Sequence, residues 1–98
     1  MAAMVGVESL RALRAGLGRM SRPDWVREIE LTEGVDADGE PAFWVWIVLE
    51  ANTPTQEVMQ PALSELRQHI KAYLADEVPG LWAYVRVREA PGGSVREA

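Results

Sequence analysis

The side chains that most often carry chemistry are few in this sequence and poorly spaced for it. The single histidine, His69, falls in a predicted helix, and the chain has no cysteine and no second histidine to complete a metal site. Ser64 precedes His69 by five residues, which puts a nucleophile and a base on different faces of a helix. No glycine-rich phosphate loop follows a predicted strand. The sequence therefore predicts a protein that is not an enzyme and holds no metal or cofactor.

The acidic segment Asp36-Ala37-Asp38-Gly39-Glu40 has the residue types of a calcium-binding loop. An EF-hand loop needs a bidentate glutamate at its twelfth position. Counted from Asp36, that position is Ile47, inside a predicted strand. The segment is therefore predicted to be the turn of a hairpin and not a metal site.

Aromatic and cationic side chains gather in two predicted strands, where every second residue shares a face. The residues that alternation places together are Trp44, Trp46, Trp82, Tyr84, Arg86 and Arg88. Tryptophan, tyrosine and arginine are the residues that most often dominate binding energy. We therefore expect these six to form a partner-binding surface, used by a homodimer or by the small subunit of a bacterial complex.

The same surface could instead be covered within the chain or bind nucleic acid. The C-terminal tail or a displaced first helix could cover the rings, and the arginines could pair with Glu28 and Glu30 on a neighbouring strand. Exposed rings also stack on the bases of single-stranded nucleic acid. The two glutamates and the formal net charge of −5 disfavour nucleic acid, which is attracted by positive grooves.

Length and composition limit the classes of protein to which this chain can belong. With 98 residues, 48% hydrophobic and 26% charged, the chain suits one globular core. Its longest apolar run, Ala42 to Leu49, has the length of a strand and not of a membrane span. The absence of cysteine fits a reducing compartment, so a cytoplasmic location is expected. Nine of the ten basic residues are arginine, a bias typical of GC-rich bacterial coding.

The positions of the secondary-structure elements follow from hydrophobic periodicity. Helical spacing from Val7 to Met20 predicts a helix over about residues 5–19, weakened by Gly16 and Gly18 in its last turns. This segment is basic, with a net charge of +3 over residues 1–23, which is also found in transit peptides. Alternation predicts strands at 25–33, 43–49 and 81–88, the first two joined as a hairpin.

A second helix is predicted between the last two strands. Thr53, Pro54 and Gln56 have the pattern of a capping box with proline at the first helical position, and an apolar stripe runs from Met59 to Leu74. Pro61 either kinks this helix or marks the start of its main part.

Together the elements predict a single α+β domain over residues 1–90 and a flexible tail over 91–98. The order is helix–strand–strand–helix–strand, the arrangement of half a ferredoxin-like fold in two layers. We expect a three-stranded sheet in the order second, first, third, with both helices on one face.

This order of elements, from about Val5 to Glu89, resembles the cytoplasmic dimerisation domain of cation diffusion facilitator transporters. The resemblance implies a dimerising role, whereas the metal-binding His and Asp residues of that family have no counterparts here. The segment Asp36 to Ala42, the aromatic strand after it, and residues 82–88 also resemble small uncharacterised bacterial proteins. Some of these are encoded beside toxin-like genes, which implies a partner protein.

Overall fold

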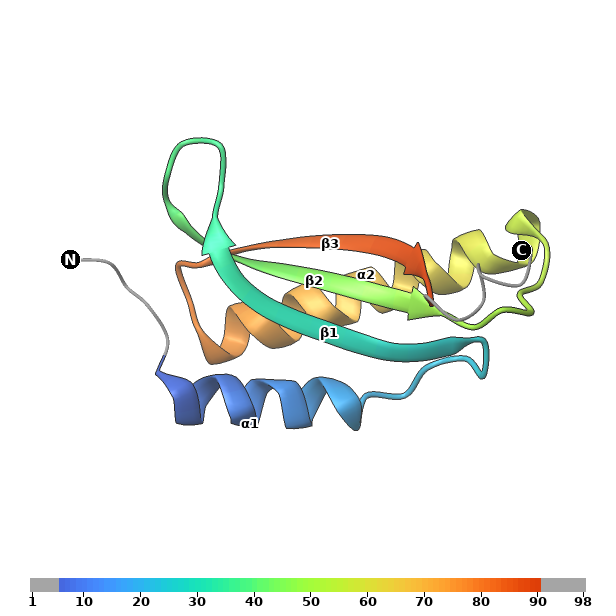
Figure 1. Ribbon diagram of the computed structural model, residues 1–98, viewed down its shortest axis with the longest axis horizontal. Coiled ribbons are helices and arrows are strands. Elements are labelled where there is room, and N and C mark those ends of the chain that lie inside the picture. The colour runs from blue at the N-terminus through green and yellow to red at the C-terminus, as the bar shows by residue number, and fades with distance from the viewer. Residues whose placement is uncertain (1–5, 91–98) are drawn as a thin grey trace.

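The computed structural model describes residues 6–90, which form two layers (Figure 1). One layer is a three-stranded sheet and the other consists of two helices, so the predicted α+β class and element order are confirmed. The elements are α1 (Val7–Gly18), β1 (Val26–Val35), β2 (Pro41–Leu49), α2 (Gln56–Glu77) and β3 (Trp82–Glu89). Residues 1–5 and the predicted tail, 91–98, lie outside the described residues.

The strand order is β1-β2-β3, so the predicted order with the first strand in the middle is wrong. β2 pairs antiparallel with β1 and parallel with β3, which follows it through α2. The reason is visible in β2 itself, which is buried on both faces, with Ala42 and Val48 1% exposed on the face without helices. A strand that is apolar on both faces belongs at the centre of a sheet.

A tight turn joins β1 to β2. The Asp36 carboxylate accepts hydrogen bonds from the backbone N–H groups of Asp38 and Glu40, at 2.9 and 3.0 Å. Gly39 has a φ of +81°, which favours glycine. The acidic segment therefore acts as a turn, as predicted, and one of its carboxylates is used to hold the backbone.

Helix α2 is continuous from Gln56 to Glu77 and contains Pro61. The prediction of Thr53 as the N-cap and Pro54 as the first helical residue is therefore wrong. Thr55 is the N-cap, and its side chain makes no capping hydrogen bond. Because α2 begins before Pro61, the proline stands within the helix as its sixth residue, where its nitrogen cannot donate the usual hydrogen bond to the residue four positions earlier.

The core lies between the helices and one face of the sheet. Its members are Leu13 and Leu17 of α1, Met59, Leu63, Leu66, Ile70 and Leu74 of α2, and Val26, Ile29, Leu31, Phe43, Val45, Ile47 and Leu49 of the sheet. Helix α1 lies alongside β1, and α2 crosses behind the sheet (Figure 1). The first helix thus belongs to the core and does not cover the opposite face.

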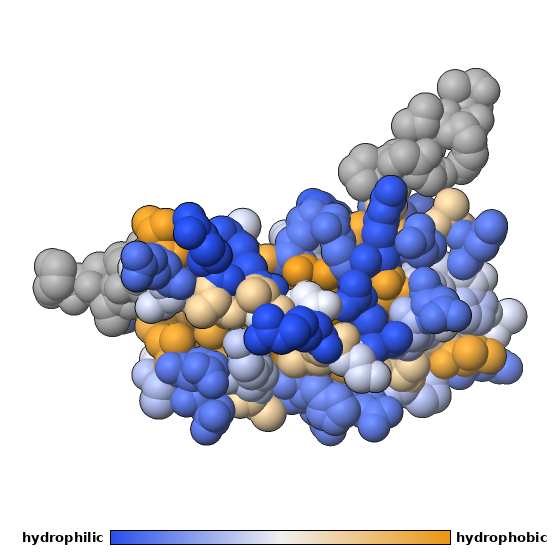
Figure 2. All heavy atoms as spheres, turned by 90° about the horizontal axis from the view of Figure 1, so that it is seen from below, coloured by the Kyte–Doolittle hydropathy of each residue, from blue (hydrophilic) through white to orange (hydrophobic). Residues whose placement is uncertain are grey.

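Viewed from the side of α1, the surface is largely hydrophilic, and hydrophobic residues form only separate patches (Figure 2). Neither helix in residues 6–90 is long and apolar enough to cross a membrane.

Candidate functional site

The six predicted binding residues all lie on the sheet face opposite the core, as the alternation predicted. We call this surface the aromatic face; it consists of Trp44, Trp46, Trp82, Tyr84, Arg86 and Arg88. The register aligns Trp44 with Tyr84 and Trp46 with Arg86 on the neighbouring strand. Since side chains paired across strands lie about 5 Å apart at Cβ, this register brings the rings and cations together.

Trp44 makes the most contacts on the aromatic face. Its ring stacks on Tyr84 with centroids 4.7 Å apart and an interplanar angle of 20°. The guanidinium carbon of Arg86 lies 5.5 Å from the indole centroid, within the range of a cation–π interaction. The indole Nε1 donates to the carbonyl oxygen of Val35 at 3.3 Å. These contacts from β1 and β3 fix the orientation of the indole.

Gly34 makes room for that indole, a role that sequence reasoning missed because the predicted strand ended at residue 33. The residue lies in β1, paired with Ala42. A Cβ atom on Gly34 would lie 2.9 Å from Cδ1 and 3.0 Å from Nε1 of Trp44. A glycine inside a strand often marks such a close approach, and that rule was the available signal.

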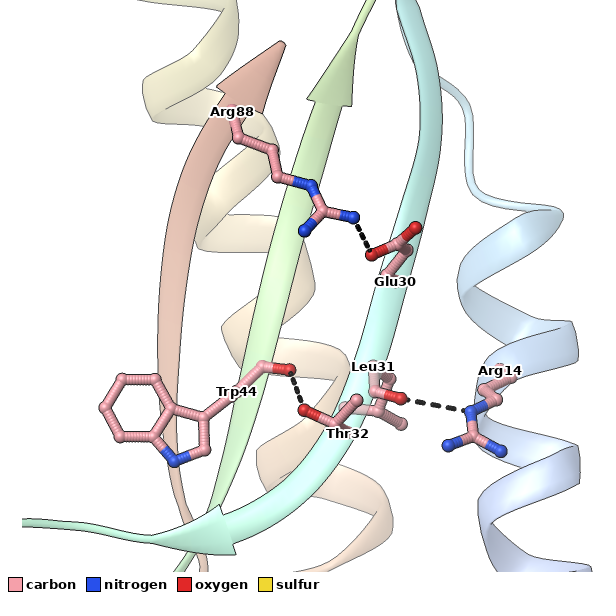
Figure 3. A network of polar contacts seen from close by, with 6 residues as sticks. All are labelled: Arg14, Glu30, Leu31, Thr32, Trp44 and Arg88. Carbon is pink, nitrogen blue, oxygen red and sulfur yellow. Dashed lines mark hydrogen bonds and ion pairs between the residues drawn. The ribbon is translucent and has the colours of Figure 1, made fainter. Parts of the chain in front are cut away.

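Trp46 is contacted by Arg88, which is itself held by an ion pair across the sheet. The guanidinium carbon of Arg88 lies 5.4 Å from the centroid of the Trp46 ring. Arg88 also forms an ion pair with Glu30 of β1, and the two side chains point toward each other above β2 (Figure 3). The expected pairing of a face arginine with a β1 glutamate is therefore present for these two residues.

Trp82 differs from the other rings because 64% of its surface is exposed, whereas Trp44, Trp46 and Tyr84 are half-buried. It lies at the start of β3, where its neighbour across the sheet is the small residue Ala42. The aromatic face therefore combines rings that are already held in place with one ring that is largely free to make new contacts.

The residues considered for catalysis are not assembled into a catalytic site. His69 and Ser64 are both exposed on α2. His69 lines a hollow of about 220 Å³ with Glu65 and Ser21, but no hydrogen bond joins any two of these three side chains. Residues 6–90 contain no polar or charged residue that is buried and no cluster of His, Asp and Glu suited to a metal ion.

Comparison with known proteins gives a similarity of fold. No protein-family model and no curated protein matches the chain. Among solved structures, a chain of CzrB, a zinc transporter of the cation diffusion facilitator type, superposes with a TM-score of 0.59 at 23% identity. The match covers 89% of this chain and 99% of the solved chain. The fold therefore has the topology of the cytoplasmic domain of a cation diffusion facilitator.

Proposed function

We propose that this chain is a protein-interaction domain without catalytic activity, which binds a second copy of itself or a partner protein through the aromatic face. The observation that carries the proposal is the largely exposed Trp82 beside the ordered pair of Trp44 and Tyr84. Large aromatic side chains at the centre of an interface are frequent hot spots of binding.

The order already present on the face supports this role. Association is opposed by the entropy lost when interface side chains become fixed, about 0.5–1.5 kcal/mol for each. Here Trp44 is stacked on Tyr84 and bonded to β1, and Arg88 is paired with Glu30. These side chains have therefore already lost much of their conformational entropy in the free protein. Binding through this surface loses correspondingly less entropy, which favours affinity.

The fold similarity is compatible with the same role. The cytoplasmic domains of cation diffusion facilitators, which the sequence also resembles, serve in dimerisation, and the solved CzrB chain has this topology over nearly its whole length. The expected cytoplasmic location belongs to the proposal as well, because a chain without cysteine suits a reducing compartment.

The proposal is tested by removing rings from the aromatic face. Trp82→Ser alone, and Trp44→Ser with Trp82→Ser, should weaken self-association or partner binding by about 30-fold or more, because truncating a hot spot costs about 2 kcal/mol or more. The measurements are light scattering after size exclusion for the homodimer and a quantitative pull-down for a partner. Circular dichroism should retain its helical signal in both variants.

Val7→Ser with Val58→Ser is the matched control, since both valines are exposed apolar residues on the helices and lie off the aromatic face. This variant should associate like the unmodified protein. A wild-type chain that is monomeric at high concentration and retains no protein in the pull-down would refute the proposal.

Single-stranded nucleic acid is the alternative ligand for the same rings. One face of Trp44 already carries Tyr84, and Arg88 is neutralised by Glu30, so less ring surface and less positive charge remain for bases and phosphates. Quenching of tryptophan fluorescence by an oligonucleotide at low salt, lost as salt rises, would favour this alternative.

A further inference from the structure

The two outer edges of the sheet differ in how their backbone groups are satisfied. At the β1 edge, the carbonyl oxygen of Leu31 points away from β2 and accepts a hydrogen bond from Arg14 Nε of α1, at 3.0 Å (Figure 3). The carbonyl oxygens of Val26 and Arg27 accept from Arg22, both at 3.3 Å. Arginine side chains and the neighbouring helix therefore close the β1 edge to another strand.

At the β3 edge, no side chain of residues 6–90 covers the outward backbone groups in this way. The N–H group of Ala90 donates to the carbonyl oxygen of Leu49 on β2, at 2.9 Å. Because alternate residues of a strand direct their backbone groups to opposite sides, the other set points outward. The outward set comprises Ala83, Val85, Val87 and Glu89. No described side chain forms a hydrogen bond with these backbone groups.

A groove of about 670 Å³ runs along this open edge. One wall comes from α2 through Arg67 and Lys71, and the other from the aromatic face through Trp82 and Arg86. The apolar residues Ala83, Val85 and Val87 line it between the two walls. The groove thus combines free backbone groups with apolar surface, as sites of strand addition do.

The charge of the groove is opposite to that of the whole chain. Arg67, Lys71 and Arg86 line it together, yet none of them forms an ion pair within residues 6–90, although the formal net charge is −5. The Nε atom of Arg67 is buried and has no hydrogen-bond acceptor. Such an atom is unusual, but it is closed to solvent, so the unpaired charges of the groove, and not this atom, favour an acidic ligand.

We infer that this groove binds an acidic, extended segment of a partner protein, which adds to the sheet as a fourth strand beside β3. Backbone pairing would supply affinity, and the three cations would select glutamate or aspartate side chains. The inference goes beyond the proposed function, because the ligand would pair with the backbone at the sheet edge, although the groove shares Trp46, Trp82, Tyr84 and Arg86 with the aromatic face.

A second copy of this chain is a poor occupant of the groove. Pairing of two β3 strands would bring Arg86 of each copy toward the cations that line the groove of the other, and like charges opposite each other are destabilising. The acidic strand β1 is not available either, because Arg14 and Arg22 occupy its outer carbonyl groups.

The test uses a blocked peptide of the same length as β3, 8 residues, in which valine and glutamate alternate. Nuclear magnetic resonance with the full chain should show slower amide exchange, by about tenfold or more, at the outward residues of β3 when the peptide is bound. A peptide with lysine in place of glutamate should not bind.

Two variants separate backbone pairing from charge recognition. Ala83→Pro removes an outward N–H group without removing a bond to β2, so the fold should persist while peptide binding weakens. Arg67→Gln with Lys71→Gln should weaken binding by about tenfold or more and reduce its salt dependence. The control is Arg11→Gln on α1 with Arg19→Gln at its C-cap, both exposed, which should bind the peptide normally.

The results of the peptide experiment distinguish failure of this inference from failure of the proposed function. Absence of peptide binding, equal binding of the lysine peptide, or binding that both variants leave unchanged would each overturn the inference. Peptide-induced shifts confined to the indole of Trp44, which does not line the groove, would also overturn it while supporting the proposed function. Binding of an oligonucleotide, and not of the acidic peptide, in the groove would replace it with nucleic-acid recognition.

Discussion

At the scale of single residues, the aromatic face is held by contacts that reach from the two outer strands, β1 and β3, toward Trp44 and Trp46 of β2. Tyr84 and Arg86 approach Trp44 from β3, the Val35 carbonyl accepts its indole N–H, and Glu30 positions the Arg88 that lies over Trp46. Strand alternation alone predicted which residues share this face. It could not predict the role of Gly34, because that depends on the direction in which the Trp44 ring turns.

Gly34→Ala should lower the free energy of unfolding by about 1–2 kcal/mol, because the new Cβ would overlap the indole of Trp44 and force it to move. The hydrogen bond to Val35 and the stack on Tyr84 should be lost with it. Urea unfolding measures the stability, and near-ultraviolet circular dichroism reports the changed ring environment.

A double-mutant cycle separates this cause from a general effect of alanine in the strand. In a Trp44→Leu background the indole is absent, so Gly34→Ala should have little further effect. If Gly34→Ala lowers the free energy of unfolding equally with and without Trp44, the overlap between the new Cβ and the indole does not explain the loss of stability.

At the scale of elements, periodicity located the helices and strands to within a few residues, whereas the strand order needed a different signal. The central position of β2 follows from its continuous apolar run, which contrasts with the alternation of β1. Hydrophobic periodicity also could not predict how α1 and α2 pack against each other. Gly16, which as a helix residue only weakens α1, lies where Tyr73 of α2 packs against it.

Gly16→Ala should destabilise the protein by about 1 kcal/mol, even though alanine favours helices. Its Cβ would lie 2.0 Å from Oη and 2.6 Å from Cζ of Tyr73, and the rigid ring would have to leave its site between the helices. Thermal or urea unfolding provides the measurement.

Gly18→Ala is the matched control on the same helix, because no atom lies within 4 Å of its added Cβ. This change should leave stability unaltered or raise it by up to about 1 kcal/mol. Equal stabilisation by both substitutions would show that Tyr73 does not depend on Gly16.

At the scale of the whole molecule, the sheet has one face and one edge that the described chain leaves without cover. The helices bury the opposite face, and α1 with Arg14 and Arg22 closes the β1 edge. A single open edge allows one strand to be added without growth into a filament. The aromatic residues and the element order could be predicted from sequence, but this asymmetry of edges depends on tertiary contacts of arginine side chains.

The central claim, that the aromatic face is buried in the assembled state, is tested most directly by hydroxyl-radical footprinting. The isolated chain at low concentration is compared with the concentrated chain and with the complex formed with any captured partner. Oxidation of Trp82, now 64% exposed, should fall severalfold on assembly, while oxidation of Val58 on α2 stays constant. Unchanged oxidation of Trp82 in an assembly that protects α1 or α2 would contradict the account.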